Sequence, residues 1–237
     1  MELMIKRIVA FILIVLIGII LLMVKPEIKK PEAITVPTRV IENPKEYLIA
    51  KISPENLILV NNTENKYGFS QIINDYNCQK AVNGGFYQED NKPLGWMIID
   101  GKQIQKVKSS QMFNGFVYIK NKRLDISFTN DDEAIYGHQS GPILINQGKP
   151  VSLQVANDKP TRRSVIAIDQ DNNTYILMIL NSLMQELPEK VSVIAEIEKL
   201  SLNKAINLDG GTASAYYDGV NKISELIAVG SVWCMIN

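Results

Sequence analysis

Apolar residues recur along most of this chain in short runs that end at turn-forming residues, and this pattern predicts a sheet-rich domain. Runs of about four to eight apolar or alternating residues bounded by Gly, Asn, Asp or Pro are typical of strands. Turn pairs such as Asp100-Gly101 and Asn121-Lys122 separate neighbouring runs and favour antiparallel hairpins. The expected strands are 47–52, 57–60, 80–83, 94–99, 103–107, 116–119, 123–128, 142–145, 151–155, 164–169, 174–180, 205–208 and 226–236.

Two segments have the pattern of helices. A short helix is expected around 70–76, and a longer one begins near Pro188, where Val191, Ile194, Ile197 and Leu200 recur on one face. The longer helix leads directly into the strand at 205–208, so we expect it to pack on the sheet. The fold class predicted is α+β, with a mixed, mainly antiparallel sheet and a few packed helices.

The N-terminus has a different pattern. Lys6 and Arg7 precede an uncharged apolar run at 8–24. If Met4 and Ile5 are included, a helix over this segment is long enough to span a hydrocarbon core of ~30 Å. No small-residue cleavage pattern follows it, so residues 1–24 are predicted to be a transmembrane signal anchor rather than a removed signal peptide or a buried core helix. Residues 25–45, rich in Pro, Lys and Glu, are predicted to be a stalk, and 46–237 the folded domain. Charges flank both ends of the span, so they do not decide its orientation.

Composition narrows the possible partners and cofactors. The chain has 25 basic and 25 acidic residues and no basic stripe, which argues against nucleic-acid binding. One histidine and two distant cysteines do not make a usual zinc site, and Asp131-Asp132-Glu133 lacks the spacing of a calcium loop. No metal and no other cofactor is predicted, although a weakly bound Ca²⁺ or Mg²⁺ stays open. Cys78 and Cys234 could pair or stay free and buried. The oligomeric state is not indicated.

Two strand ends carry the same polar signature. The strand at 205–208 runs into Asp209-Gly210-Gly211, and the strand at 80–83 ends in Asn83-Gly84-Gly85. Glycines let a ligand approach the backbone, and a carboxylate beside bare amides suits a substrate with both hydroxyls and an oxyanion. We expect the two turns to meet around one pocket.

Four blocks in order resemble one family, the phosphodiester glycosidases (NAGPA-like domains), which include N-acetylglucosamine-1-phosphodiester alpha-N-acetylglucosaminidase and bacterial exopolysaccharide-biosynthesis proteins. The similarity extends from about Tyr47 to the C-terminus. Thr212 and Ala213 precede Ser214 where family members often have a further glycine and paired serines. The blocks are Asn83-Gly84-Gly85-Phe86-Tyr87, Ser140-Gly141-Pro142-Ile143-Leu144 with Gly148, Thr161-Arg162-Arg163-Ser164 and Asn207-Leu208-Asp209-Gly210-Gly211.

The resemblance implies an enzyme that hydrolyses a sugar-1-phosphodiester bond in a cell-surface glycan or glycolipid. Asp209 is the expected catalytic carboxylate, with a turn-capping role as the alternative. Arg163 is expected to bind the phosphate, and Arg162 is read as a solvated neighbour. His138, the single histidine, is a further catalytic candidate or a plain loop residue. Glu89 and Asp90 are possible second carboxylates.

The remaining site residues are expected to bind substrate. They are Asn83, Gly84, Gly85, Phe86, Tyr87, Ser140, Gly141, Asn207, Gly210, Gly211, Thr212 and Ser214. Phe86 also suits the core, and the glycines also suit a bulge or a tight turn. The resemblance places the domain on the extracytoplasmic side of a single-pass membrane protein. Two other functions stay open: a non-catalytic glycan-binding module in polysaccharide assembly, favoured by the Thr212-Ala213 departure, and a transferase that uses an acceptor other than water.

Overall fold

The computed structural model describes residues 46–88, 90 and 92–237. The predicted membrane span at 8–24 and stalk at 25–45 lie outside these residues and stay predictions. Across the described ranges, no helix is both long and apolar enough to cross a membrane.

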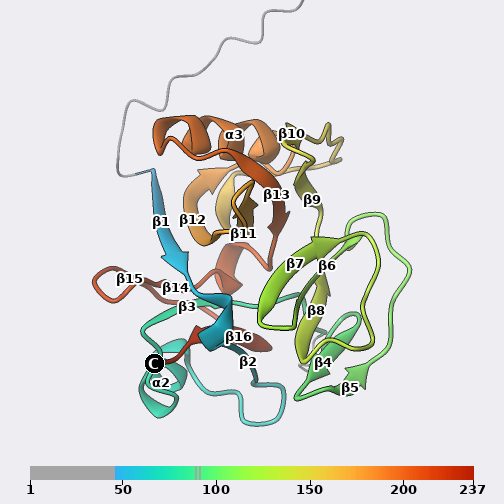
Figure 1. Cartoon of the computed structure of the whole chain (residues 1–237), viewed down its shortest axis with the longest axis vertical. Helices are drawn as coiled ribbons and strands as arrows, with labels where there is room; N and C mark the ends of the chain where they lie inside the picture. The colour runs from blue at the N-terminus through green and yellow to red at the C-terminus, as the bar shows by residue number, and fades with distance from the viewer. Residues whose placement is uncertain (1–45, 89, 91) are drawn as a thin grey trace, which may run out of the picture. The chain divides into compact units, whose positions relative to one another are not determined.

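The strands of the described residues form three sheets (Figure 1). The first contains β1 (Tyr47–Ile52), β9 (Ile143–Asn146), β10 (Lys149–Pro150), β11 (Thr161–Asp169), β12 (Thr174–Ser182) and β13 (Leu202–Asn207), in the order β1-β12-β11-β13-β9-β10. The second contains β2 (Leu57–Asn61), β3 (Lys80–Asn83), β14 (Tyr216–Tyr217), β15 (Lys222–Ile223) and β16 (Ser231–Met235), in the order β15-β14-β3-β16-β2. The third contains β4 (Met97–Ile99), β5 (Lys102–Gln105), β6 (Gly115–Lys120), β7 (Arg123–Ser127) and β8 (Tyr136–Ser140), in the order β5-β4-β8-β6-β7.

All the strand pairs in these sheets are antiparallel. The mainly antiparallel sheets are as predicted. Within the described residues there are two α-helices, α2 (Phe69–Asp75) and α3 (Leu187–Ile197), and two short 3₁₀ turns, η1 (Pro54–Asn56) and η2 (Gly211–Ala213), so the fold is α+β or mainly β. The parallel component of the expected mixed sheet is not found among the described residues.

The apolar run at residues 165–168 of β11 follows from burial on both faces. Val165 and Ala167 point into a cluster under α3, whereas Ile166 and Ile168 point into a second cluster shared by all three sheets. Because neighbouring strand residues face opposite sides, a strand covered on both sides needs an apolar residue at every position. Leu187, Val191 and Ile194 of α3 are fully buried in the first cluster, which confirms that this helix packs on the sheet next to β13.

The predicted hairpin turns are present. Asp100 and Gly101 connect β4 to β5 with φ values of 50° and 71°, and Asn121 and Lys122 connect β6 to β7 with φ values of 51° and 62°. Two successive positive φ values match the twist of flanking antiparallel strands.

Cys78, just before β3, and Cys234 in β16 form a disulfide with a Cα–Cα distance of 5.3 Å. This settles the two alternatives for the cysteines in favour of pairing. The bond joins segments that are 156 residues apart in the sequence.

Two strand predictions need correction. Residues 151–155 form no strand: Val151 adds one hydrogen bond to the Leu144 carbonyl after β10, and Leu153 and Val155 then pack beside the α3 cluster. The expected strand at 226–236 shortens to β16, since Leu226 is 75% exposed and its N–H bonds the carbonyl of Thr212. Strand β8 was not predicted, because its sequence YGHQS has no apolar run.

Candidate active site

The two Gly-Gly turns meet, as predicted. The Asp209 N–H donates to the Gly84 carbonyl at 3.2 Å, and the Asn83 side-chain amide donates to the Asp209 carbonyl at 2.8 Å. The end of β3 is therefore fixed directly against Asp209, the second residue after β13.

Asn83 joins three elements and has no capacity left for a ligand. Its side-chain oxygen accepts from the Ser164 hydroxyl at 2.6 Å and from the Ala215 N–H at 2.9 Å. The side chain is 1% exposed. The predicted substrate contact through this side chain is thus replaced by a structural role.

The Asp209 carboxyl is only partly exposed, and its described hydrogen bond comes from the Gly210 N–H at 2.8 Å. Burial raises the pKa of Asp209 to about 7, and the Gly210 bond opposes this shift. A carboxyl group with this pKa can take up or release a proton near neutral pH, which general acid–base catalysis requires.

A bulge in β11 between Thr161 and Arg163 sets the direction of the Arg163 side chain. Its Nε donates to the Ser182 carbonyl at 3.2 Å, and Nη2 donates to Asp158 Oδ1 at 3.2 Å. Burial lowers the pKa of Arg163, while the Asp158 charge raises it. These bonds hold the guanidinium in one orientation.

The remaining nitrogen of Arg163 faces the Asp209 turn. Nη1 has no hydrogen bond to a described residue, and a Cβ placed on Gly210 would lie 3.6 Å from it. Arg162, by contrast, donates to the Ser224 carbonyl at 3.1 Å and is partly exposed. Arg163 Nη1 is therefore an N–H group beside Gly210 that has no described partner.

His138 lies in the interior. It is 1% exposed, its Nε2 accepts from the Trp233 indole N–H at 2.8 Å, and its Nδ1 lies 3.2 Å from the Gln139 carbonyl. Since Nε2 accepts, the proton is on Nδ1, and burial lowers the pKa of His138 to about 4. A neutral ring with both nitrogens occupied does not suit the predicted acid or phosphate contact.

The His138 ring instead supports the first Gly-Gly turn. A Cβ on Gly85 would lie 2.5 Å from His138 Nδ1, and one on Gly84 would collide with the Ser231 hydroxyl. The Gly84 N–H already donates to the Ser231 carbonyl at 2.8 Å, so this amide is not available to substrate. Only the Gly85 N–H of this pair has no hydrogen bond to a described residue.

Ser140, Gly141 and Asn207 form a buried connection between β8 and β13. The Ser140 hydroxyl and the Gly141 N–H both donate to the Asn207 carbonyl, at 2.8 and 3.0 Å. The Asn207 side-chain amide donates to the Gly141 carbonyl at 2.9 Å. These three predicted substrate contacts therefore hold the strand that presents Asp209, and all three residues are buried.

The other predicted substrate contacts differ in exposure. Phe86 is half-buried and packs on Phe113, with ring centroids 4.5 Å apart. Gly210 and Gly211 are partly exposed, Thr212 is exposed and Ser214 is fully buried. Of the proposed second carboxylates, Asp90 is exposed and paired with Lys92 at 2.8 Å, and Glu89 lies outside the described residues.

Buried polar atoms without a partner gather around these turns. Five of the seven such side-chain atoms within the described part of the chain belong to residues that adjoin the two turns or the segment after them: Tyr87, Asn207, Ser214, Glu225 and Ser231. Native proteins leave few buried polar atoms unpaired, and functional sites are a common exception. This clustering marks the Asp209 region as the place where a polar ligand would complete the hydrogen bonding.

Glu225 is a residue that sequence reasoning missed. It follows β15 in a segment with no recognisable motif, and only the folded chain brings it to the site. Tyr87 was expected to bind substrate, and burial raises its pKa to about 12, with smaller contributions from the charges of Asp209 and Glu225. Tyr87 thus lies within electrostatic range of both carboxylates.

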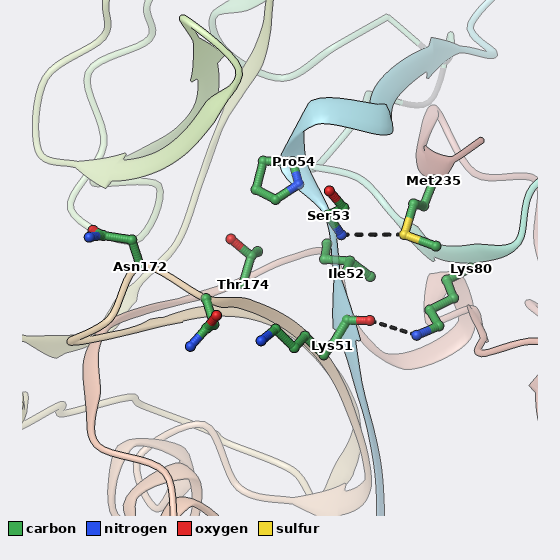
Figure 2. A pocket seen from close by; sticks show the side chains of 9 residues that line it. Lys51, Ile52, Ser53, Pro54, Lys80, Asn172, Thr174 and Met235 are labelled. Carbon is green, nitrogen blue, oxygen red and sulfur yellow. Dashed lines mark hydrogen bonds between the residues drawn. The ribbon is translucent and has the colours of Figure 1, made fainter. Parts of the chain in front are cut away.

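Two surface cavities lie elsewhere. One of about 470 Å³ is shown in Figure 2, where the Lys80 ammonium donates to the Lys51 carbonyl and the Ser53 N–H points to Met235 sulfur. A smaller one of about 180 Å³ lies beside Phe128 and Lys204. None of the sequence-predicted site residues lines either cavity, so the expected pocket around Asp209 is not among them. Among the residues that the structure describes, no three His, Cys, Asp or Glu side chains are grouped as metal ligands.

Comparisons with known proteins found a matching family model and solved structures of similar fold. Residues 76–235 match the family model described as NAGPA, phosphodiester glycosidase. The catalytic domain of zebrafish N-acetylglucosamine-1-phosphodiester alpha-N-acetylglucosaminidase, auto-inhibited by its pro-peptide, is similar in structure: the TM-score is 0.61 at 13% identity, over 81% of this chain and 82% of that one. None of the curated proteins matches this chain.

Two further solved structures share the fold. A protein from Synechocystis gives a TM-score of 0.52 at 14% identity, over 79% of this chain and 59% of that one. A protein from Burkholderia pseudomallei K96243 gives a TM-score of 0.53 at 12% identity, over 81% and 74% of the two chains. At these identities the likeness to solved structures extends to the fold alone.

Proposed function

Because the family model covers residues 76–235, this chain belongs to the phosphodiester glycosidase family, and we propose that it hydrolyses the bond between the anomeric carbon of a sugar and a phosphodiester. An N-acetylglucosamine-1-phosphodiester is the first substrate to test. One structural observation supports this activity above the others: Asp209, with a pKa of about 7, and the unoccupied Nη1 of Arg163 both border Gly210.

Arg163 and Asp209 have different roles in the proposed reaction. Arg163 stabilises the negative charge that develops on the departing phosphate, since a guanidinium binds phosphate oxygens through directed N–H groups. A water oxygen forms a bond to the anomeric carbon, and the bond from that carbon to the phosphate oxygen breaks, with its electron pair moving to the phosphate. The water proton passes to the ionised form of Asp209.

This division explains why one acid–base carboxylate suffices for the reaction. A phosphate monoester can leave as an anion without being protonated. A sugar alkoxide is a poorer leaving group and needs a proton from an acid. The second carboxylate that ordinary glycosidases use as an acid is therefore not required at the leaving group.

We also propose that the domain acts outside the cytoplasm, anchored through residues 8–24, on a cell-surface glycan or glycolipid such as an exopolysaccharide precursor. The uncharged run at 8–24 supports the anchor. The disulfide between Cys78 and Cys234 supports an oxidising compartment.

The test is sugar release by the full-length chain in detergent from N-acetylglucosamine-1-phosphodiester and a panel of other sugar-1-phosphodiesters. We expect Asp209→Ala to abolish release, with a loss of at least about 10³-fold in kcat, while Asp132→Ala at an exposed turn keeps it. Turnover at the wild-type rate in Asp209→Ala would contradict the central role of this carboxyl. Glycan binding without release from any panel member would favour the non-catalytic binding module.

A further inference from the structure

Glu225 is held in place between two segments of the candidate site. Its neighbour Ser224 accepts from the Arg162 guanidinium at 3.1 Å, and its neighbour Leu226 donates to the Thr212 carbonyl at 2.7 Å. Arg162 precedes the phosphate-binding Arg163, and Thr212 lies three residues after Asp209. The backbone on both sides of Glu225 is thus tied to the elements that carry the proposed catalytic groups.

The two oxygens of the Glu225 carboxylate have different surroundings. Oε1 accepts from the Phe69 N–H at 2.7 Å, at the first residue of α2. Oε2 is buried and has no partner among the described residues. Capping α2 accounts for one oxygen only, and a buried carboxylate oxygen without a partner is a rare arrangement outside functional sites.

The Tyr87 hydroxyl is a second buried group without a described partner. Its side chain lies against Gly230, where an added Cβ would lie 2.9 Å from Tyr87 Cβ. The raised pKa of Tyr87 keeps the hydroxyl protonated, and the charges of both Asp209 and Glu225 contribute to this shift after burial. A neutral phenol can donate one hydrogen bond and accept others.

We propose that Glu225 Oε2 and the Tyr87 hydroxyl bind the hydroxyl groups of the sugar ring, while Arg163 binds the phosphate. A carboxylate accepts hydrogen bonds from sugar hydroxyls but repels a phosphate, so the two halves of the substrate are sorted by charge. This assignment rests on the proposed function for the identity of the ligand. Beyond that function, the assignment names Glu225 and Tyr87 as the residues that select the sugar.

Binding of two probes to the full-length chain in detergent distinguishes residues that bind the sugar from residues that bind the phosphate. The probes are N-acetylglucosamine-1-phosphate and inorganic phosphate, titrated by calorimetry. Glu225→Gln keeps an oxygen that can accept from the Phe69 N–H, so α2 stays capped. We expect this variant to weaken binding of the sugar phosphate about 10-fold and to bind inorganic phosphate at least as tightly as the wild type.

Two further variants complete the comparison. Tyr87→Phe should weaken the sugar phosphate several-fold and spare inorganic phosphate, whereas Arg163→Lys should weaken both probes. Equal affinity of wild type and Glu225→Gln for the sugar phosphate, or an equal loss for both probes, would overturn the assignment. So would a wild-type chain that binds no sugar-1-phosphate of a wider panel. Since binding needs no turnover, absence of hydrolysis would reject the proposed reaction without affecting this test.

Discussion

The Asp209 carboxyl lies where its ionised form is disfavoured. Ionised Asp209 therefore lowers the free energy of unfolding. Its pKa of about 7 in the fold compares with ~3.9 in an unfolded chain. Between these values the folded protein holds a proton that the unfolded chain has released. The residue's contribution to the free energy of unfolding therefore falls as the pH rises from about 4 to 7 and stays low above that.

Replacing Asp209 with Asn should remove this cost while keeping an oxygen for the Gly210 N–H. We expect Asp209→Asn to raise the free energy of unfolding by about 1–4 kcal/mol at pH 8 and to change it little at pH 4. Urea denaturation of both proteins at the two pH values measures the difference. Asp132→Asn, at an exposed position, should change neither value. A stabilisation of equal size at both pH values would show that desolvation of the charge is not its cause.

Residues that a short-range sequence pattern marks could be predicted from the sequence. Asp209 and Arg163 each lie at the end of an apolar run, and Asp209 is next to a glycine pair, so short-range pattern placed both at strand ends. Glu225 has no such pattern, because its position depends on bonds from Arg162 and Thr212 to its neighbours. The polar side chains of Asn83 and Asn207 looked like ligand contacts, yet the fold uses them to join strands.

At the scale of elements, the sequence predicted strands where hydrophobic burial alone specifies them. Residues 165–168 of β11 and 175–180 of β12 are continuous apolar runs because α3 covers one face of their sheet and the other sheets cover the other face. β8 has the opposite character: His138, Gln139 and Ser140 are buried polar residues whose hydrogen bonds replace apolar packing. Such a strand can be identified only once its partners are known.

The packing of α3 gives a prediction for this element. Ile194 is fully buried against the sheet, whereas Ile197 on the same helix is 47% exposed. We expect Ile194→Ala to lower the free energy of unfolding by about 2–5 kcal/mol, through lost burial and a cavity, and Ile197→Ala to lower it by less than about 1 kcal/mol. Chemical denaturation measures both, and equal losses would show that α3 does not pack as described. Sugar phosphate affinity should stay unchanged in the folded fraction of each variant.

For the whole domain, the disulfide connects the beginning of β3 with the last strand, β16. These two strands are neighbours in the second sheet, where Ala81 lies opposite Cys234. β3 ends at Asn83, just before Gly84, and β16 begins at Ser231, whose carbonyl accepts from the Gly84 N–H. The covalent bond therefore restrains the same pair of strands that holds the first Gly-Gly turn.

Because the bond closes a loop of 156 residues, it should restrict the unfolded chain strongly. We expect the double variant Cys78→Ala/Cys234→Ala to lose about 2–5 kcal/mol of unfolding free energy, measured by urea denaturation without reductant. Dithiothreitol should reduce the stability of the wild type by a similar amount and leave the double variant unchanged. A wild type that reductant does not affect, with thiols detected before any was added, would mean that the cysteines are unpaired, and it would remove the main structural support for an oxidising, extracytoplasmic location.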